Sequence, residues 1–366
     1  MHSTDTMIPV QAIKGRGAAT RMAHRFSCNA REGFDDGWDT TAGRTHAAQE
    51  AAPPATQVHM EDVRSVITAN DSPDIFFDYS INPYRGCEHG CVYCFAQPTH
   101  SYLGLSPGLD FETQIIAKRN IAAVLQQELR RPSYLPKSLN IGSATDCYQP
   151  VERQLQLTRS VLGVLEQCKH PASLLTKSSG VERDIDLLAP MAAQHLAAVY
   201  VSVTTLDGAL ARILEPRAAA PQRRLRTIAE LAKAGIPVGV SVAPQIPFIN
   251  EDMEQVLDAA AQAGASSAFY TVIRLPWEID PLFQQWLALH YPQRAQRVMA
   301  RIREMRGGQN YNSDFASRMK GQGVWAQLLK QRFDKTCARL GLKRQRHELD
   351  MSRFDARCWD VQRGLF

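Results

Sequence analysis

The sequence predicts an α/β fold with a parallel sheet at its centre, and three observations support this. From about residue 71 to residue 276, short apolar segments alternate with longer segments whose apolar residues recur every three or four positions. Glycine follows two of the longer segments, as Gly235 and Gly264, where a helix would end. Repeated strand–helix units favour parallel strands joined by right-handed crossovers.

Six strands are expected, and the one at 197–203 is the clearest because it is apolar and rich in β-branched residues. The helix that follows it carries Leu225, Ile228 and Ala232 on one face. A full eight-stranded barrel would need more units than the sequence shows. The other expected strands are a segment just before the cysteine loop described below and residues 138–142, 172–176, 236–242 and 267–273.

The chain divides into three regions. Residues 1–70 are polar with little periodicity, so we predict an irregular, partly disordered arm. Its basic stretch Lys14–Arg25 indicates either a flexible tail or a contact with phosphate. Residues 71–280 hold the strand–helix units and form the core domain. Residues 281–366 are predicted to be a mostly helical extension.

Composition and charge limit the classes of function. With 44% hydrophobic and 22% charged residues, the 366-residue chain can bury a substantial core. No apolar run approaches the ~20 residues that span a bilayer, and no secretory signal is visible, so we expect a cytoplasmic protein without membrane contact. Residues 281–366 carry 17 Lys+Arg and 7 Asp+Glu, a net charge of +10, against −5 for the rest. This asymmetry indicates either a segment that faces nucleic acid or a solvated helical face.

Three cysteines stand in one short loop, and they carry most of the functional prediction. Cys87, Cys91 and Cys94 have the spacing Cys-x3-Cys-x2-Cys, and Gly86 and Gly90 allow the backbone to turn tightly around them. Thiolates are the usual ligands of iron–sulfur clusters, and a [4Fe–4S] cluster takes four of them. Three thiolates therefore indicate a cluster with one open iron, or a metal site completed from elsewhere in the chain.

A structural zinc site is the alternative, with Cys147, Cys168 or His89 as a further ligand. Zinc sites usually pair their ligands in two separated knuckles. A second knuckle is missing here, because the remaining cysteines stand alone at 28, 147, 168, 337 and 358. Disulfides are disfavoured, since scattered cysteines without a signal peptide fit a reducing compartment.

The cysteine loop resembles that of the radical S-adenosylmethionine (SAM) superfamily, whose motif is Cys-x3-Cys-x-aromatic-Cys, with Tyr93 in the aromatic position. The flanking segments resemble the branch related to spore photoproduct lyase, and most closely a group of uncharacterised proteins. This resemblance implies a partial (β/α)6 barrel. The segments that carry it are 70–74, 80–87, 98–104, 145–152, 214–217 and 234–240.

The resemblance also implies a [4Fe–4S] cluster on the three cysteines and SAM on the open iron. Active residues of such barrels follow the carboxyl ends of strands. Lys177 and Ser202 are the candidates for the SAM carboxylate, Ser143 and Asp146 for its amine or ribose, and Tyr93 for its adenine. The alternatives are a helix N-cap for Asp146 and a solvated loop lysine for Lys177.

Two departures from family patterns concern the reaction. The Gly-Gly-Glu motif of many radical SAM enzymes is absent after the second strand, where Ser143-Ala-Thr-Asp146 stands. Photoproduct lyases place a hydrogen-donating cysteine just before the Ser/Thr-Asp pair, whereas Cys147 follows Asp146 here. Photoproduct repair is therefore disfavoured. Cys147 is our candidate catalytic hydrogen donor, and a buried apolar cysteine is the alternative.

By resemblance, the protein is a lyase- or transferase-like enzyme. A one-electron donor such as flavodoxin or ferredoxin would reduce the cluster, and SAM cleavage would yield a 5′-deoxyadenosyl radical that takes hydrogen from the substrate. The basic segment 281–366 and the lyase-like motifs favour a nucleic-acid substrate; a small molecule or peptide is the other option. The alternative from another class is a non-catalytic iron–sulfur or zinc scaffold that docks a partner through the basic C-terminal segment.

Overall fold

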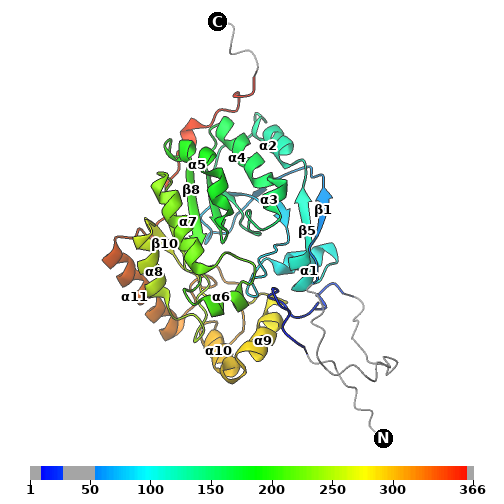
Figure 1. Ribbon diagram of the computed structural model, residues 1–366, viewed down its shortest axis with the longest axis vertical. Helices are drawn as coiled ribbons and strands as arrows, with labels where there is room; N and C mark the ends of the chain where they lie inside the picture. Colours follow the sequence, from blue (N-terminus) through cyan, green and yellow to red (C-terminus); the bar gives the residue numbers. More distant parts are fainter. Residues whose placement is uncertain (1–9, 28–53, 361–366) are drawn as a thin grey trace.

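The computed structural model describes residues 10–27 and 54–360 (Figure 1). Its centre is a seven-stranded sheet with the strand order β10-β9-β8-β7-β6-β3-β2, open at β10 and β2. Strand β2 (Ile67–Ala69) runs antiparallel to β3, and the other six strands are parallel. The six are β3 (Tyr79–Ile81), β6 (Leu139–Ile141), β7 (Ala172–Thr176), β8 (Ala197–Ser202), β9 (Val238–Ser241) and β10 (Ser267–Phe269). The predicted α/β fold with six parallel strands is confirmed.

Helices cover this sheet (Figure 1). In α4, Leu157, Val161, Leu162 and Leu165 are buried at helical spacing. Every residue of β8 is buried, as expected of a central parallel strand covered on both faces. The helices between the strands are α1 (Leu109–Thr113), α2 (Ile121–Leu129), α3 (Glu152–Leu155), α4 (Leu157–Gln167), α5 (Ile185–Ala192), α6 (Gly208–Leu214), α7 (Pro221–Lys233) and α8 (Met253–Gln262).

The register of the sheet brings the carboxyl ends of its central strands to one edge. Thr176, the last residue of β7, lies opposite Val201 of β8, and Ser202 lies opposite Ser241 of β9. The loops that follow these strands therefore emerge side by side. The 3-10 helices η1 (Gln97–Leu103) and η2 (Ser179–Asp184) lie in two of the connections.

A second, three-stranded sheet corrects the prediction that residues 1–70 are irregular. Its order is β1-β5-β4, from β1 (Gln57–Glu61), β5 (Gln114–Lys118) and β4 (Tyr84–Arg85). Strand β1 pairs with β5 over its whole length, and β2 belongs to the main sheet. Since β1 is almost entirely exposed, it has no apolar alternation from which a strand could be predicted.

The described part of the N-terminal arm packs against the loop that carries the three cysteines. The backbone N–H groups of Gly17 and Ala18 donate to the Glu112 carboxylate at 3.1 and 2.8 Å, and Arg16 donates to the Glu112 carbonyl at 3.1 Å. A Cβ on Gly17 would lie 1.8 Å from the Gly90 carbonyl oxygen, so only glycine permits this approach. The arm thus forms a wall of the cysteine loop.

For the basic stretch 14–25, the sequence indicates either a flexible tail or a contact with phosphate. Two of its arginines are engaged by the core instead, since Arg21 pairs with Asp110 at 2.8 Å and Arg25 with Glu278 at 3.1 Å. Residues 28–53, which the sequence also assigned to the arm, lie outside the described residues.

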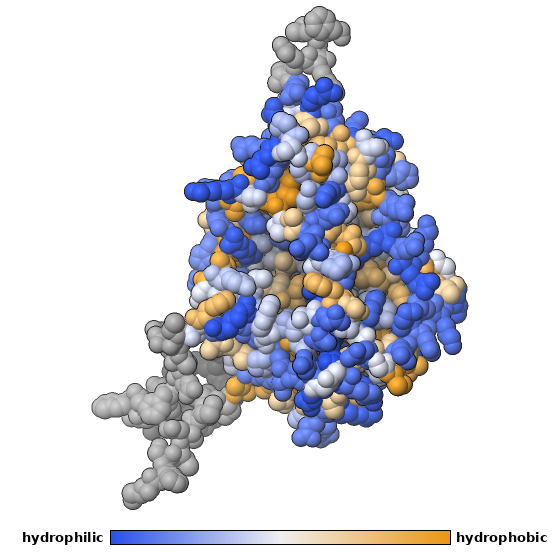
Figure 2. Space-filling view, turned by 180° about the vertical axis from the view of Figure 1, so that it is seen from behind, coloured by the Kyte–Doolittle hydropathy of each residue, from blue (hydrophilic) through white to orange (hydrophobic). Residues whose placement is uncertain are grey.

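The C-terminal extension contains α9 (Ile279–His290), α10 (Pro292–Glu304), α11 (Gly323–Leu340) and the short η3 (Met351–Arg353). Trp286 and Phe333 are 2% and 3% exposed and anchor α9 and α11 to the core. No described helix is both long and apolar enough to cross a membrane. Hydrophilic residues cover most of the face in Figure 2, with hydrophobic ones interspersed.

Candidate active site

The three cysteines lie on residues 86–96, which we call the cluster loop and which joins β4 to η1. The loop is held by main-chain hydrogen bonds from Cys87 N to Phe111 O (2.9 Å) and from Cys94 N to Cys91 O (3.0 Å). Gly86 adopts a φ of +82°, and a Cβ there would lie 2.9 Å from the Phe111 carbonyl oxygen. Glycine is therefore required at position 86, because both the backbone conformation and the nearby carbonyl oxygen disfavour a side chain.

The thiols of the cluster loop interact electrostatically with one another. Burial raises the pKa of Cys87, Cys91 and Cys94; Cys94 raises that of Cys87 further, and both raise that of Cys91. The ammonium of Lys177 acts in the opposite direction on Cys91 and Cys94, because a cation favours the thiolate. The protein thus supplies a positive charge beside thiols that must lose protons to bind metal.

These residues fit the [4Fe–4S] cluster that the sequence predicts. Within residues 10–27 and 54–360, no three His, Cys, Asp or Glu side chains are grouped so that they could hold a single metal ion. A four-iron cluster requires a different arrangement, because each thiolate binds its own iron. Three thiols on one partly buried loop, with a lysine facing them, provide that donor set.

A buried ionic network lies on what we call the inner face of the cluster loop. The Tyr93 hydroxyl donates to the Glu215 carboxylate, which also accepts from Thr204 Oγ1 at 2.5 Å and pairs with Arg224. The side chains of Glu215 and Arg224 are 0% and 1% exposed. Burial opposes ionisation of Glu215, but Arg224 and Lys177 outweigh it and lower the pKa to about 2.

Lys177 follows β7 and points to this inner face. Its Nζ lies 5.8 Å from the centroid of the Tyr93 ring, and the side chain is partly buried. Burial opposes the charged ammonium, yet the neighbouring Cys91 and Glu215 outweigh this and raise the pKa of Lys177. The ammonium therefore lies partly buried beside the cluster loop, and its role toward SAM stays a prediction.

Asp146 ties together the loops that follow β6 and β7. It accepts hydrogen bonds from Thr176 Oγ1 (2.7 Å), Lys177 N (2.6 Å) and Tyr148 N (2.9 Å), and lies 3.3 Å from His89 Nδ1. Although burial opposes ionisation, His89 and these hydrogen bonds hold the pKa of Asp146 well below its usual range. Protein groups thus engage both carboxylate oxygens. Asp146 is not the helix N-cap of the alternative prediction, because the N-cap of α3, the next helix, is Val151.

The two serines chosen from the sequence lie at the same sheet edge. Ser143 Oγ accepts from Asn82 Nδ2 at 3.2 Å, and Asn82 Oδ1 accepts from Ala144 N at 2.9 Å, which fixes the turn after β6. Ser202 ends β8, is buried, and its carbonyl accepts from Arg224 at 3.1 Å. Tyr93, Lys177 and Ser202 therefore meet through the inner-face network.

Cys147 lies in the hydrophobic core. Its side chain is 0% exposed, and its sulfur would be 3.1 Å from a Cβ on Gly142. Burial, together with the neighbouring Asp146 and Glu152 carboxylates, raises the pKa of the Cys147 thiol well above its usual value. The structure therefore places a buried thiol in the apolar core, and the hydrogen-donor role stays a prediction.

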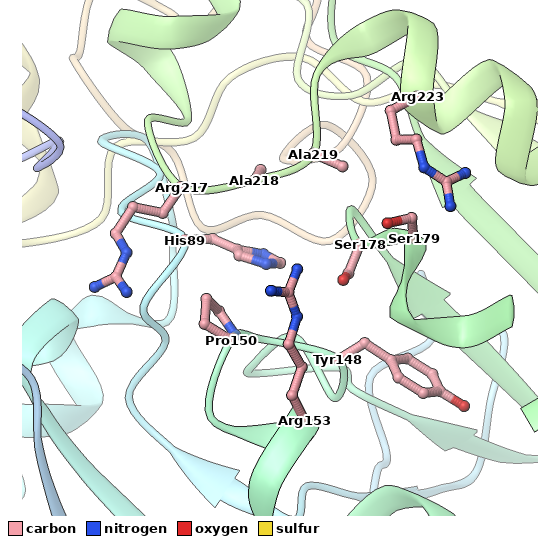
Figure 3. Close-up of a pocket in the computed structure, with 10 residues that line it drawn as sticks. All are labelled: His89, Tyr148, Pro150, Arg153, Ser178, Ser179, Arg217, Ala218, Ala219 and Arg223. Carbon is pink, nitrogen blue, oxygen red and sulfur yellow. The ribbon is translucent and has the colours of Figure 1, made fainter. Parts of the chain in front are cut away.

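A pocket of about 260 Å³ opens beside His89 of the cluster loop, and we call this part of the loop the outer face (Figure 3). Figure 3 shows the imidazole of His89 and the guanidinium of Arg153 pointing into the same hollow. Arg217 and Arg223 flank it and pair with Glu88 at 3.1 Å and with Glu182 at 2.5 Å. The other lining residues are Tyr148, Pro150, Ser178, Ser179, Ala218 and Ala219.

The sequence analysis missed several charged residues of both faces. Glu215 and Arg217 fall in the 214–217 segment that carried the family resemblance. The sequence therefore pointed to this segment but assigned no role to either residue. His89 was considered only as a zinc ligand. Arg224 gave no signal, because an arginine in the first turn of an amphipathic helix is normally solvated.

Comparisons with known proteins agree with this geometry. The family model of the Radical SAM superfamily matches residues 81–260. An uncharacterised protein of Mycobacterium tuberculosis is 39% identical over 232 residues, which are 63% of this chain and 67% of that protein. An uncharacterised protein of Methanocaldococcus jannaschii is 24% identical over 215 residues, 59% of this chain and 77% of that protein.

The structure is also similar to solved structures of spore photoproduct lyase. The complex of that enzyme with dinucleoside spore photoproduct gives a TM-score of 0.53 at 16% identity, covering 79% of this chain and 82% of that one. A mutant with bound AdoMet and the same dinucleoside gives 0.52 at 16% identity, covering 80% and 82%. At this identity the likeness shows a common fold.

The chain belongs to the radical SAM superfamily, as its cysteine loop predicted. The cofactors that this family implies are a [4Fe–4S] cluster and S-adenosylmethionine.

Proposed function

We propose that the protein is a radical SAM enzyme in which Cys87, Cys91 and Cys94 hold three irons of a [4Fe–4S] cluster and the fourth iron takes SAM. The observation that carries this proposal is the group of three interacting thiols beside Lys177, at the carboxyl edge of a parallel sheet. When bound, the cluster and SAM supply a 5′-deoxyadenosyl radical after one-electron reduction.

The residues of the inner face would bind and orient SAM. Lys177 offers a charge-assisted hydrogen bond to the carboxylate, supported by Ser202, and Ser143 serves the amine or ribose. The Tyr93 ring, whose hydroxyl is fixed by Glu215, offers an apolar surface to the adenine. Because protein groups already engage both oxygens of Asp146, we assign it to positioning Lys177.

Nucleic acid is the substrate class that we favour, because the C-terminal extension places basic groups in a groove of about 590 Å³ between β10 and α11. Lys320, Lys330, Lys343 and Arg344 line it against the single acid Asp334. Burial lowers the pKa of Lys320 to about 8, and its ammonium donates to the Tyr270 carbonyl at 2.9 Å. A phosphate here would compensate the positive charge of these side chains.

Anisotropy of labelled single-stranded oligonucleotides tests the substrate class. We expect affinity to fall steeply with salt, because phosphate contacts release counterions. A Lys320→Met/Lys343→Met double variant should show a smaller salt slope than the wild-type protein. Salt-independent or absent binding would favour a small molecule or peptide as substrate.

Electron paramagnetic resonance tests the SAM site. After anaerobic reconstitution and reduction with dithionite, the signal of the cluster should change when SAM is added, because SAM binds the open iron. A protein that takes up only zinc would contradict the proposal. A cluster whose signal ignores SAM would favour the scaffold alternative.

A further inference from the structure

We propose that the pocket on the outer face of the cluster loop docks an acidic one-electron carrier protein, whose carboxylates enter beside His89 and Arg153. This inference rests on the proposed function, since a cluster that cleaves SAM must first be reduced. It adds a place on this chain where the electron enters.

The wall of the pocket is the cluster loop itself. His89 stands between Cys87 and Cys91, is 2% exposed, and presents its ring to the pocket (Figure 3). Its Nδ1 lies 3.3 Å from Asp146 Oδ2, which leaves the other edge of the ring toward the hollow. The backbone N–H of Arg217 donates to the His89 carbonyl at 3.2 Å and fixes the rim to the loop. A partner seated here is therefore two residues from two of the proposed cluster ligands.

The pocket carries uncompensated positive charge. Arg217 and Arg223 are each paired with a carboxylate, and their side chains are still 31% and 39% exposed. Arg153 is exposed and forms no ion pair with any residue in the described part of the chain, although its guanidinium points into the hollow. The Ser178 hydroxyl accepts from Gly180 N at 3.1 Å, so its own hydrogen remains available to an anion. This surface suits carboxylates and would steer an acidic protein toward the loop.

The size of the pocket favours a protein over a free small molecule. Ligand sites for cofactors and metabolites usually measure about 300–1,000 Å³. At about 260 Å³ this pocket is smaller than that range, yet it accommodates one or two side-chain carboxylates. It therefore fits groups that protrude from a larger surface.

The electron transfer at this site is balanced without further reactants. One electron leaves the reduced carrier, which becomes oxidised, and enters the cluster, which becomes reduced. No bond forms or breaks, and no proton is required. The lining of the pocket does not include Tyr93, Glu215 or Arg224, so a partner in the pocket does not displace the inner-face network.

The test compares Arg153→Glu with Lys335→Glu in the reconstituted full-length protein, using an acidic flavodoxin as the probe. Lys335 is exposed on α11, which does not line the pocket, so both variants change the net charge equally. Titration calorimetry measures flavodoxin binding, and stopped-flow absorbance measures cluster reduction by reduced flavodoxin, both without SAM. We expect Arg153→Glu to weaken binding and slow reduction about tenfold at low salt, with the difference shrinking as salt rises.

Reduction by dithionite is the control, and it should be the same in both variants and the wild type. The proposal is overturned if wild-type protein does not bind the flavodoxin, or if Arg153→Glu behaves as Lys335→Glu. It is also overturned if Arg153→Glu slows dithionite equally, or weakens oligonucleotide binding and not flavodoxin binding. Because neither readout uses SAM, a failure of SAM cleavage would count against the proposed function alone.

Discussion

The two faces of the cluster loop handle charge in different ways. On the inner face, Glu215 and Arg224 are almost fully buried and compensate each other. On the outer face, the Arg223–Glu182 pair is partly exposed, at 39% and 21%. A buried pair is costly to break because the remaining charge is left without water, whereas a partly exposed charge is resolvated. This difference supports the proposed roles, in which the inner face holds a cofactor and the outer face exchanges partners.

The boundary between these faces passes between neighbouring residues. Lys177 points to the inner face, whereas Ser178 and Ser179 line the outer pocket. Asp146 holds this turn through the Lys177 N–H, and His89 connects it to the cluster loop. One loop after β7 therefore serves both faces, which makes their roles separable by substitution.

The largest effect on cofactor content and activity should come from substitutions in the cluster loop. Cys91→Ala removes one of three thiolates, so we expect loss of the cluster and of all SAM cleavage. Iron and sulfide content, with 5′-deoxyadenosine formation, measure this. Cys337→Ala, a buried cysteine on α11, is the matched control and should keep both. Full iron content in Cys91→Ala would contradict the assignment of Cys91 as a cluster ligand.

Next in size is the stability of the inner-face network. Glu215→Gln leaves Arg224 buried without its counter-charge, and we expect a loss of about 3–5 kcal/mol in the free energy of unfolding. Glu182→Gln removes the partner of Arg223 on the outer face and should cost less than about 1 kcal/mol. Urea denaturation of the metal-free proteins compares the two. Equal losses of unfolding free energy in the two variants would contradict the difference in burial energetics between the two faces.

Acid should weaken the same network. The folded-state pKa of Glu215 is about 2, against a usual value of 4.5, so its stabilisation is complete above pH 4.5 and is lost as the pH falls toward 2. A pKa shift of this size corresponds to a change on the order of 3 kcal/mol in the free energy of unfolding. Urea midpoints across this range should fall less in Glu215→Gln than in the wild type. Parallel curves for the two proteins would show that Glu215 does not carry the acid dependence.

The smallest expected effect concerns Lys177. Lys177→Met removes the proposed charge-assisted bond to SAM, and we expect SAM affinity to fall about 10- to 100-fold while iron content is kept. Equilibrium SAM binding to the reconstituted protein measures this, with Lys335→Met as the control. An unchanged affinity would show that a cation other than Lys177 binds the SAM carboxylate.

Sequence patterns predicted the parts of the molecule that depend on local periodicity or on a fixed spacing. The fully buried β8 and the amphipathic α4 were visible because their burial follows the periods of a strand and a helix. The three cysteines were visible because their ligand spacing is local. Lys177 and Ser202 were selected because Lys177 directly follows β7 and Ser202 ends β8, and their roles toward SAM stay predictions.

Features that depend on distant pairing were missed. Strand β1 is defined by its register with β5, and its residues are exposed. The position of Glu215 under Tyr93 joins residues 122 positions apart. Gly17 gave no sign of its contact with Gly90, because the close approach exists only after folding. Cys147 was chosen for its place beside Asp146, and its burial could not be read from that.

The formation of 5′-deoxyadenosine tests the central claim most directly. The reconstituted protein is reduced with dithionite in the presence of SAM under anaerobic conditions, beside single alanine variants of Cys87, Cys91 and Cys94. We predict that the wild-type protein forms 5′-deoxyadenosine and methionine and that each variant forms neither. A wild-type protein that binds its cluster and SAM yet forms no 5′-deoxyadenosine would contradict the account.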